Sequence, residues 1–180
     1  IRIKDVTQKR FALSDRLPNI DDVVRANEGH LKILEAMALK ELRAYLRKNR
    51  LPVNVSFSGG KDSLASLILS RKAMTHIDVI FINTGLEFPE TVKYVRSFCS
   101  DHHLKLKEIQ ADGSFFEHVK SLGPPAKDYR WCCKTNKLGP MTTFLNKHYP
   151  KGCVTIEGRR IYESMNRSTI KEVERNPYVP

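Results

Sequence analysis

The sequence predicts an α/β fold built on an open, mostly parallel sheet with helices on both faces. Segments with the apolar patterns of strands alternate with segments whose apolar residues recur at helical spacings of three and four. One strand segment, residues 77–82, is apolar except at Asp78, which is typical of a strand buried on both sides in a parallel sheet. Repeated βα units of this kind have right-handed crossovers, so their helices are expected to cover the sheet.

Residues 20–49 come first and have a helical pattern. One face of this helix is apolar and consists of Leu31, Leu34, Ala38, Leu42 and Tyr45. We expect Asn27 to cap its main part, because a short polar side chain can accept a hydrogen bond from the first free N–H groups of a helix. Pro52 follows just past its end. We interpret the helix as scaffold.

The remaining segments are expected to alternate strand and helix. We predict strands at residues 52–57, 77–82, 104–109 and 153–156, and helices at residues 62–72, 89–102, 115–122 and 136–148. Ligands of such sheets bind beyond the carboxyl ends of the strands. Three loops that begin at strand ends have unusual sequences and are therefore the candidate site: residues 58–63, 83–89 and 157–167.

The composition limits the class of protein. The chain has 180 residues, a hydrophobic fraction of 41% and a net charge of +11, which favours a polyanionic partner, either a nucleotide or a nucleic acid. No apolar run approaches the roughly 20 residues that span a bilayer, so we expect a cytoplasmic protein with no membrane partner. Four cysteines are too few for a disulfide scaffold and favour metal or redox use.

The first loop has the residues of a phosphate cradle. Gly59 and Gly60 allow backbone conformations that let successive N–H groups point into one concavity. The helix that follows adds its unpaired N-terminal N–H groups and a partial positive charge. The alternative is a plain glycine-rich turn with a solvated lysine. We assign nucleotide binding to Ser56, Ser58, Gly59, Gly60, Lys61, Asp62 and Ser63.

The other two loops carry polar and cationic groups. The second offers amide, hydroxyl and carboxylate groups suited to a base, a ribose or a cation: Asn83, Thr84, Gly85 and Glu87. Taken alone it is also a common turn before a helix. In the third, Gly158 lets Arg159 and Arg160 approach one phosphate or sulfate, which guanidinium groups bind through two parallel hydrogen bonds. An exposed arginine pair is the alternative.

Adjacent cysteines occur at Cys132 and Cys133. A disulfide between neighbouring residues is strained, but two successive thiolates can ligate one metal or iron–sulfur cluster. The alternative is that both thiols are packed without a function. Cys99 and Cys153 occur singly, within a predicted helix and a predicted strand, and we interpret them as small buried groups.

These motifs resemble those of one family. Residues 58–63 read Ser-Gly-Gly-Lys-Asp-Ser and resemble the PP-loop of adenine-nucleotide alpha-hydrolase families, which grips the pyrophosphate of ATP. Residues 83–91 and the Arg159-Arg160 loop resemble segments of the phosphoadenylyl-sulfate (PAPS) reductase family. Residues 132–140 resemble the cysteine pair of adenylyl-sulfate (APS) reductases, which supplies half the ligands of a [4Fe-4S] cluster. Those enzymes take the other half from a C-x-x-C sequence further on, which this chain lacks.

The resemblance implies a Rossmann-like (HUP, or adenine nucleotide alpha hydrolase-like) domain at residues 50–180, preceded by an arm and scaffold helix at residues 1–49. We interpret both ends as cut from a longer protein. The implied activity is oxidoreductase chemistry: reduction of APS or PAPS to sulfite with a thiol or other electron donor and a [4Fe-4S] cluster. Lys61, Arg159 and Arg160 would act as catalytic residues, stabilising the phosphosulfate charge.

The intact PP-loop supports a second hypothesis, because sulfonucleotide reductases typically lack the full Ser-Gly-Gly-Lys-Asp-Ser sequence. The protein would then be an ATP pyrophosphatase that uses Mg²⁺ and adenylates a substrate for sulfur transfer, with RNA, such as a tRNA base, as the acceptor. A third hypothesis is a nucleotide-binding module without catalysis. The sequence leaves the oligomeric state open.

Overall fold

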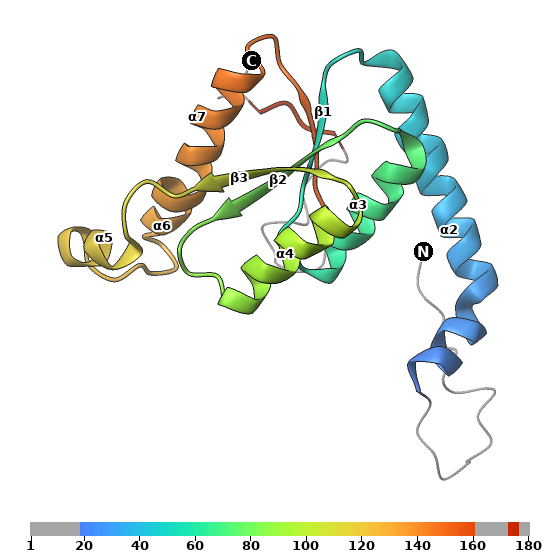
Figure 1. The fold of residues 1–180 in the computed structure, drawn as a ribbon, viewed down its shortest axis with the longest axis horizontal. Coiled ribbons are helices and arrows are strands. Elements are labelled where there is room, and N and C mark those ends of the chain that lie inside the picture. The colour runs from blue at the N-terminus through green and yellow to red at the C-terminus, as the bar shows by residue number, and fades with distance from the viewer. Residues whose placement is uncertain (1–18, 161–172, 177–180) are drawn as a thin grey trace. The chain divides into compact units, whose positions relative to one another are not determined.

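The computed structural model describes residues 19–160 and 173–176. Residues 161–167 of the predicted third loop lie outside this part. The chain divides into two compact units, residues 1–38 and 39–180. Helix α2 (Ile20–Lys48) runs from the first unit into the second (Figure 1). The predicted domain boundary after residue 49 stays a prediction.

Helix α2 begins at Ile20, earlier than the predicted cap at Asn27. The cap is Asn19, whose Oδ1 accepts a hydrogen bond from the Asp22 N–H at 2.9 Å, while the Asn19 N–H donates to Asp22 Oδ2 at 3.1 Å. This reciprocal pair satisfies donors at the helix start. Asn27 lies inside the helix, where its Nδ2 donates to the Val23 carbonyl. The prediction at Asn27 was therefore wrong.

The sheet is parallel throughout its four strands. These are β1 (Val53–Ser56), β2 (Asp78–Asn83), β3 (Lys105–Gln110) and β4 (Val154–Ile156), in the spatial order β3-β2-β1-β4. Each neighbouring pair is parallel, with Asn54 opposite Asp78 in one register and opposite Thr155 in the other. This confirms the predicted α/β class with a mostly parallel sheet.

Two apolar clusters cover the two sheet faces. Helices α3 (Lys61–Ala73) and α4 (Pro89–Asp101) pack on one face, and α7 (Gly139–His148) packs on the other (Figure 1). The first cluster is centred on Val55, Phe57, Leu67, Val79, Phe81, Val95 and Cys99, and the second on Ile80, Ile109, Leu145 and Tyr149. Burying these side chains on both faces is the main stabilising contribution to the fold.

The segment before β4 differs from the prediction. After α5 (Phe115–Leu122), a continuous helical stretch begins at Trp131 and not at residue 136: α6 (Trp131–Cys133), the π-turn η1 (Lys134–Leu138) and then α7. The Gly139 N–H donates to the Lys134 carbonyl, which closes the wider turn. Pro140 has no N–H to continue the α-helical pattern, so a π-turn at this point has a local cause.

No helix of the described residues is both long and apolar enough to cross a membrane.

Candidate functional site

The chain order of the strands locates the candidate site. From β1 the sheet grows through β2 to β3 in one direction, whereas β4 joins β1 on its other side. In an open parallel sheet, the crevice at such a reversal, beyond the carboxyl ends of the strands, is where ligands bind. The two loops at this position are residues 58–63, which follow β1, and residues 157–160, which follow β4.

Internal hydrogen bonds hold the loop after β1 in a curved shape. Ser63 lies in the first turn of α3 and is 7% exposed, and its hydroxyl donates to the Gly60 carbonyl at 2.9 Å. The same oxygen accepts from the Ser58 N–H at 3.2 Å and lies 3.1 Å from Ser58 Oγ. Gly60 is the N-cap of α3 and has no side chain to cap it, which leaves the first N–H groups of the helix available to an anion.

Gly59 makes the turn and rests on a neighbouring helix. Its φ of +79° lies in the left-handed region that favours glycine. A Cβ at this position would lie 3.1 Å from Val95 Cγ2 and 3.3 Å from Thr91 Cγ2, both in α4. The loop backbone therefore packs directly on α4, and this contact helps to fix the position of the loop.

The loop after β4 touches the first turn of α3. A Cβ on Gly158 would lie 2.4 Å from the Asp62 carbonyl oxygen and 2.9 Å from the Ser63 nitrogen, so only glycine allows this approach. Arg160 Nε lies 3.1 Å from Asp62 Oδ2. Two predicted loops, 95 residues apart in sequence from Ser63 to Gly158, thus meet at one edge of the sheet, the candidate anion-binding edge.

The cationic groups of this edge are accessible. The Lys61 side chain is 76% exposed, and its Nζ is 3.8 Å from Asp62 Oδ2. Arg159 forms an ion pair with Glu157. With Arg160, three cations lie on the two loops that meet at the amino end of α3, an arrangement that suits a phosphate, pyrophosphate or phosphosulfate group.

The second predicted loop follows β2, one strand away from the reversal. Its polar groups bond mainly to one another: Glu87 accepts from the Thr84 N–H at 2.8 Å and from the Thr84 hydroxyl at 2.9 Å, and the Gly85 N–H donates to Asn83 Oδ1 at 3.1 Å. Glu87 therefore shapes the turn in this structure. The loop also borders an open depression of about 530 Å³ whose lining includes Lys93 and Arg96.

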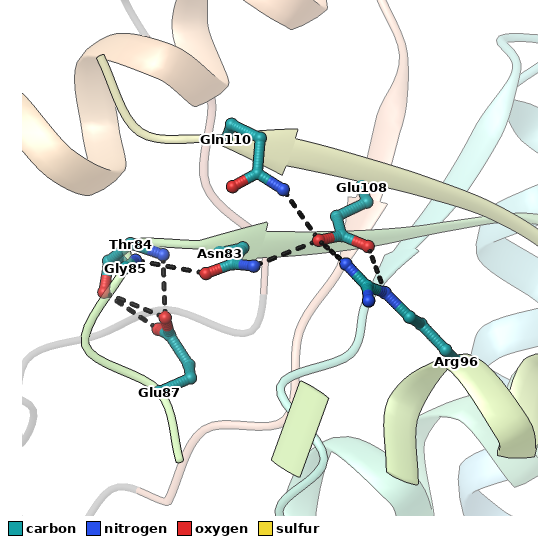
Figure 2. A network of polar contacts seen from close by, with 7 residues as sticks. All are labelled: Asn83, Thr84, Gly85, Glu87, Arg96, Glu108 and Gln110. Atoms are coloured by element: carbon teal, nitrogen blue, oxygen red, sulfur yellow. Dashed lines mark hydrogen bonds and ion pairs between the residues drawn. The ribbon is translucent and has the colours of Figure 1, made fainter. Parts of the chain in front are cut away.

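Sequence reasoning missed a polar network beside this loop. Glu108 of β3 accepts two hydrogen bonds from Arg96 of α4, both at 2.8 Å, one from Asn83 Nδ2 at 3.0 Å and one from Gln110 Nε2 at 2.8 Å (Figure 2). The hydrogen bonds from Arg96 are the main cause that lowers the pKa of Glu108 from 4.5 to about 2. No signal in the sequence pointed to it, because Glu108 lies among the polar residues Lys105, Lys107 and Gln110 of the same strand.

This network predicts a pH dependence of stability. Because the pKa of Glu108 is lower in the folded chain, the ionised carboxylate stabilises the fold above pH 4.5, and that contribution is lost as the pH falls from 4.5 toward 2. In Glu108→Gln we expect the free energy of unfolding to fall less steeply over this range than in the unmodified protein. Urea unfolding at several pH values measures both slopes, and equal slopes would contradict the assignment.

The cysteine pair begins the helical stretch that follows α5. Cys132 and Cys133 are partly buried, and Arg130 Nη2 donates to Cys133 Sγ at 3.4 Å. A [4Fe-4S] cluster needs four ligands, and the described residues contain no group of three or more metal-ligating side chains. The donor set in this part of the chain is thus incomplete for a cluster. Burial raises the pKa of the Cys99 thiol to about 11, which makes it a poor nucleophile at neutral pH.

Residues 52–180 match the phosphoadenosine phosphosulfate reductase domain family, which covers the whole sheet and both loops of the edge. The chain belongs to this family. It is a nucleotide-binding PP-loop family, and residues 58–63, which resemble a PP-loop in sequence, lie within the matched range. The predicted membership is therefore confirmed.

Relatives and solved structures agree at the level of family and fold. An uncharacterized protein of Methanocaldococcus jannaschii is 45% identical over 161 residues, which cover 88% of this chain and 33% of that protein. A probable sulfurtransferase of the same organism is 30% identical over 86 residues, 44% of this chain and 25% of that protein. The ammonia-dependent NAD synthetase of Campylobacter jejuni has a similar fold, with a TM-score of 0.55 at 13% identity over 72% of this chain and 57% of that chain. The chain thus spans about a third of the length of the first relative.

Proposed function

We propose that this domain binds the phosphate groups of an adenine nucleotide between the PP-loop and the loop after β4. The observation that carries this proposal is the contact of Gly158 with the first turn of α3, which brings Arg159 and Arg160 to the same edge as Lys61. Site residues of the PP-loop, Ser58 to Ser63, would donate backbone N–H and hydroxyl hydrogen bonds, and the three cations would neutralise the bound anion.

The reaction we propose is reduction of an adenylylated sulfate, as in the enzymes that give the family its name. A thiolate of a donor attacks the sulfur atom, the bond from sulfur to the bridging phosphate oxygen breaks, and AMP or adenosine 3′,5′-bisphosphate leaves with both electrons of that bond. A second thiolate attacks the sulfur of the donor in the resulting S-sulfonate, which forms a disulfide and releases sulfite. Lys61, Arg159 and Arg160 would stabilise the charge that develops on the leaving phosphate.

The cysteine pair belongs to this proposal only in part. Cys132 and Cys133 would supply two of the four thiolates of a [4Fe-4S] cluster whose other ligands come from outside residues 1–180. Their partial burial and the Arg130 contact to Cys133 are compatible with ligation of a negatively charged group. Iron and sulfide analysis of the anaerobically purified full-length protein, compared with its Cys132→Ser/Cys133→Ser variant, tests this part by itself.

A second candidate is an ATP pyrophosphatase that uses Mg²⁺ and adenylates a substrate such as a tRNA base for sulfur transfer. The intact PP-loop favours it, and so does the similarity of part of the chain to a probable sulfurtransferase. In this case the same cradle would hold the pyrophosphate that leaves ATP.

One experiment separates the two candidates. The full-length, anaerobically purified protein is incubated with a dithiol reductant and either APS or PAPS, and separately with ATP, Mg²⁺ and total tRNA. Release of sulfite, at a rate that Lys61→Ala lowers, supports the reductase. Release of pyrophosphate from ATP that depends on tRNA, without any sulfite in the first assay, would overturn the reductase in favour of the second candidate.

A further inference from the structure

A cluster of polar side chains outside the anion-binding edge connects three elements of the fold. Arg96 comes from α4, Glu108 from β3 and Asn83 from the end of β2, and the Glu108 carboxylate accepts hydrogen bonds from the other two (Figure 2). The Glu108 side chain is 17% exposed, so its charge is largely removed from water. The two hydrogen bonds from Arg96 offset the cost of removing this carboxylate from water.

The chemistry of the partners fixes which way the Asn83 amide points. An ionised carboxylate can only accept hydrogen bonds, so the NH₂ group of Asn83 must face Glu108. A backbone N–H can only donate, so the carbonyl oxygen of Asn83 must face Gly85, where the distance is 3.1 Å. The Asn83 side chain therefore links Glu108 to the turn that contains Gly85.

Among the described residues, no other side-chain hydrogen bond links that turn to β3. Within residues 83–87, Thr84 and Glu87 bond to each other, and Gly85 has a φ of +81°, a conformation that glycine adopts readily. Alongside, the Asn83 carbonyl accepts from the Ala111 N–H at 2.9 Å, which continues the strand pairing by one bond. The side-chain bonds of Asn83 are thus what ties the turn to the network.

The helix that carries Arg96 also supports the PP-loop. Thr91, Tyr94 and Val95 of α4 lie against Gly59, between one and five residues before Arg96 in the same helix. A shift of α4 along the sheet would move both loops, and the bond from Arg96 to Glu108 opposes that shift. The ion pair between Arg96 and Glu108 therefore helps to hold both the turn at residues 83–87 and the PP-loop in place.

We propose that Arg96 and Glu108 are positioning residues for the nucleotide site, acting through the Asn83 side chain on the turn at residues 83–87 and through α4 on the PP-loop. This inference rests on the proposed adenine-nucleotide binding. In this proposal both residues act through other residues and not by contact with the nucleotide. Their removal is expected to weaken binding because the turn loses the position that the Asn83 side chain gives it.

A double-mutant cycle in the full-length protein tests the route through Asn83. The dissociation constants of ATP and APS are measured by calorimetry for the unmodified protein, Asn83→Ala, Glu108→Gln and the combined variant. We expect each single substitution to weaken binding about tenfold, the scale of a hydrogen bond to a charged group. If Glu108 acts through Asn83, the combined variant binds no more weakly than Asn83→Ala. Effects that multiply to about a hundredfold would overturn the route through Asn83.

Lys105→Ala is the matched control. Lys105 Nζ lies 3.7 Å from Asp78 Oδ1 and so links the same two strands, β2 and β3, at their opposite ends. If the network only held the strands together, both substitutions would lower the melting temperature and neither would change nucleotide affinity. We expect Lys105→Ala to leave the nucleotide affinity unchanged and Glu108→Gln to lower it. An affinity in Glu108→Gln equal to that of the unmodified protein would also overturn the inference.

A measurement without a ligand separates this inference from the proposed function. Hydrogen exchange of the Gly85 amide, followed by NMR, is expected to be faster in Glu108→Gln and in Asn83→Ala and unchanged in Lys105→Ala. If the unmodified protein binds neither ATP nor APS, the proposed function fails and the role in nucleotide binding fails with it, whatever the exchange rates. If it binds them but the Gly85 amide is equally protected in all variants, only the inference on Arg96 and Glu108 fails.

Discussion

Gly158→Ala is expected to cost the protein most of its nucleotide affinity. The new Cβ would lie 2.4 Å from the Asp62 carbonyl oxygen and 2.6 Å from the Asp62 carbonyl carbon, and these backbone atoms cannot rotate away as a side chain could. The loop after β4 must therefore move off the first turn of α3. That shift takes Arg159 and Arg160 away from Lys61, and a displacement of this size in a charged site is expected to weaken ATP or APS binding by at least tenfold.

The control for this substitution is Gly29→Ala. Gly29 lies inside α2, and a Cβ there would meet no described atom within 4 Å. Alanine favours a helix interior over glycine by about 1 kcal/mol, so the control should raise the melting temperature slightly and leave binding unchanged. Calorimetric titration of both variants with ATP measures the difference. Wild-type affinity in a folded Gly158→Ala protein would contradict the shared edge.

Lys61→Ala is expected to weaken nucleotide binding by about 1 to 3 kcal/mol, the scale of a lost hydrogen bond to a charged group, or roughly 5- to 150-fold in the dissociation constant. Lys61 is the first residue of α3 and its side chain is 76% exposed, so its removal should hardly change the stability of the fold. The substitution therefore tests ligand contact with little risk of unfolding.

Arg71→Ala serves as the matched control for Lys61→Ala, because it removes the same charge from an exposed position at the other end of the same helix. We expect its affinity for ATP and APS to equal that of the unmodified protein. Fluorescence or calorimetric titrations at two salt concentrations separate contact from general charge effects. Equal losses in the two variants would show that only the overall charge matters and that Lys61 faces solvent.

The strand pattern and the loop chemistry were predictable because they are local. The run of apolar residues in β2, the glycines before α3 and the position of loops at strand ends follow from periodicity and turn chemistry alone. The sequence predicted that the loops containing Asp62 and Gly158 both follow strands of the sheet, but it did not predict their contact. Its closeness depends on β4 pairing directly with β1, and strand order is not contained in the pattern of any single segment.

Other features depended on contacts between distant residues. Arg96 and Glu108 look like ordinary charged positions in a helix and a strand, and only the packing of α4 on β3 brings them together. The early start of the helical stretch at Trp131 was also missed, because the sequence pattern predicted a helix from residue 136. In the structure that proline follows a π-turn inside a longer helical stretch.

We propose that the edge formed by the PP-loop and the loop after β4 binds the phosphate groups of a nucleotide. Calorimetry of the full-length protein with adenosine, AMP, APS and ATP tests this directly. We expect adenosine to bind far more weakly than the phosphate-bearing ligands, and Lys61→Ala to remove much of that difference. Adenosine binding as tightly as ATP or APS would show that this edge does not bind the phosphate groups.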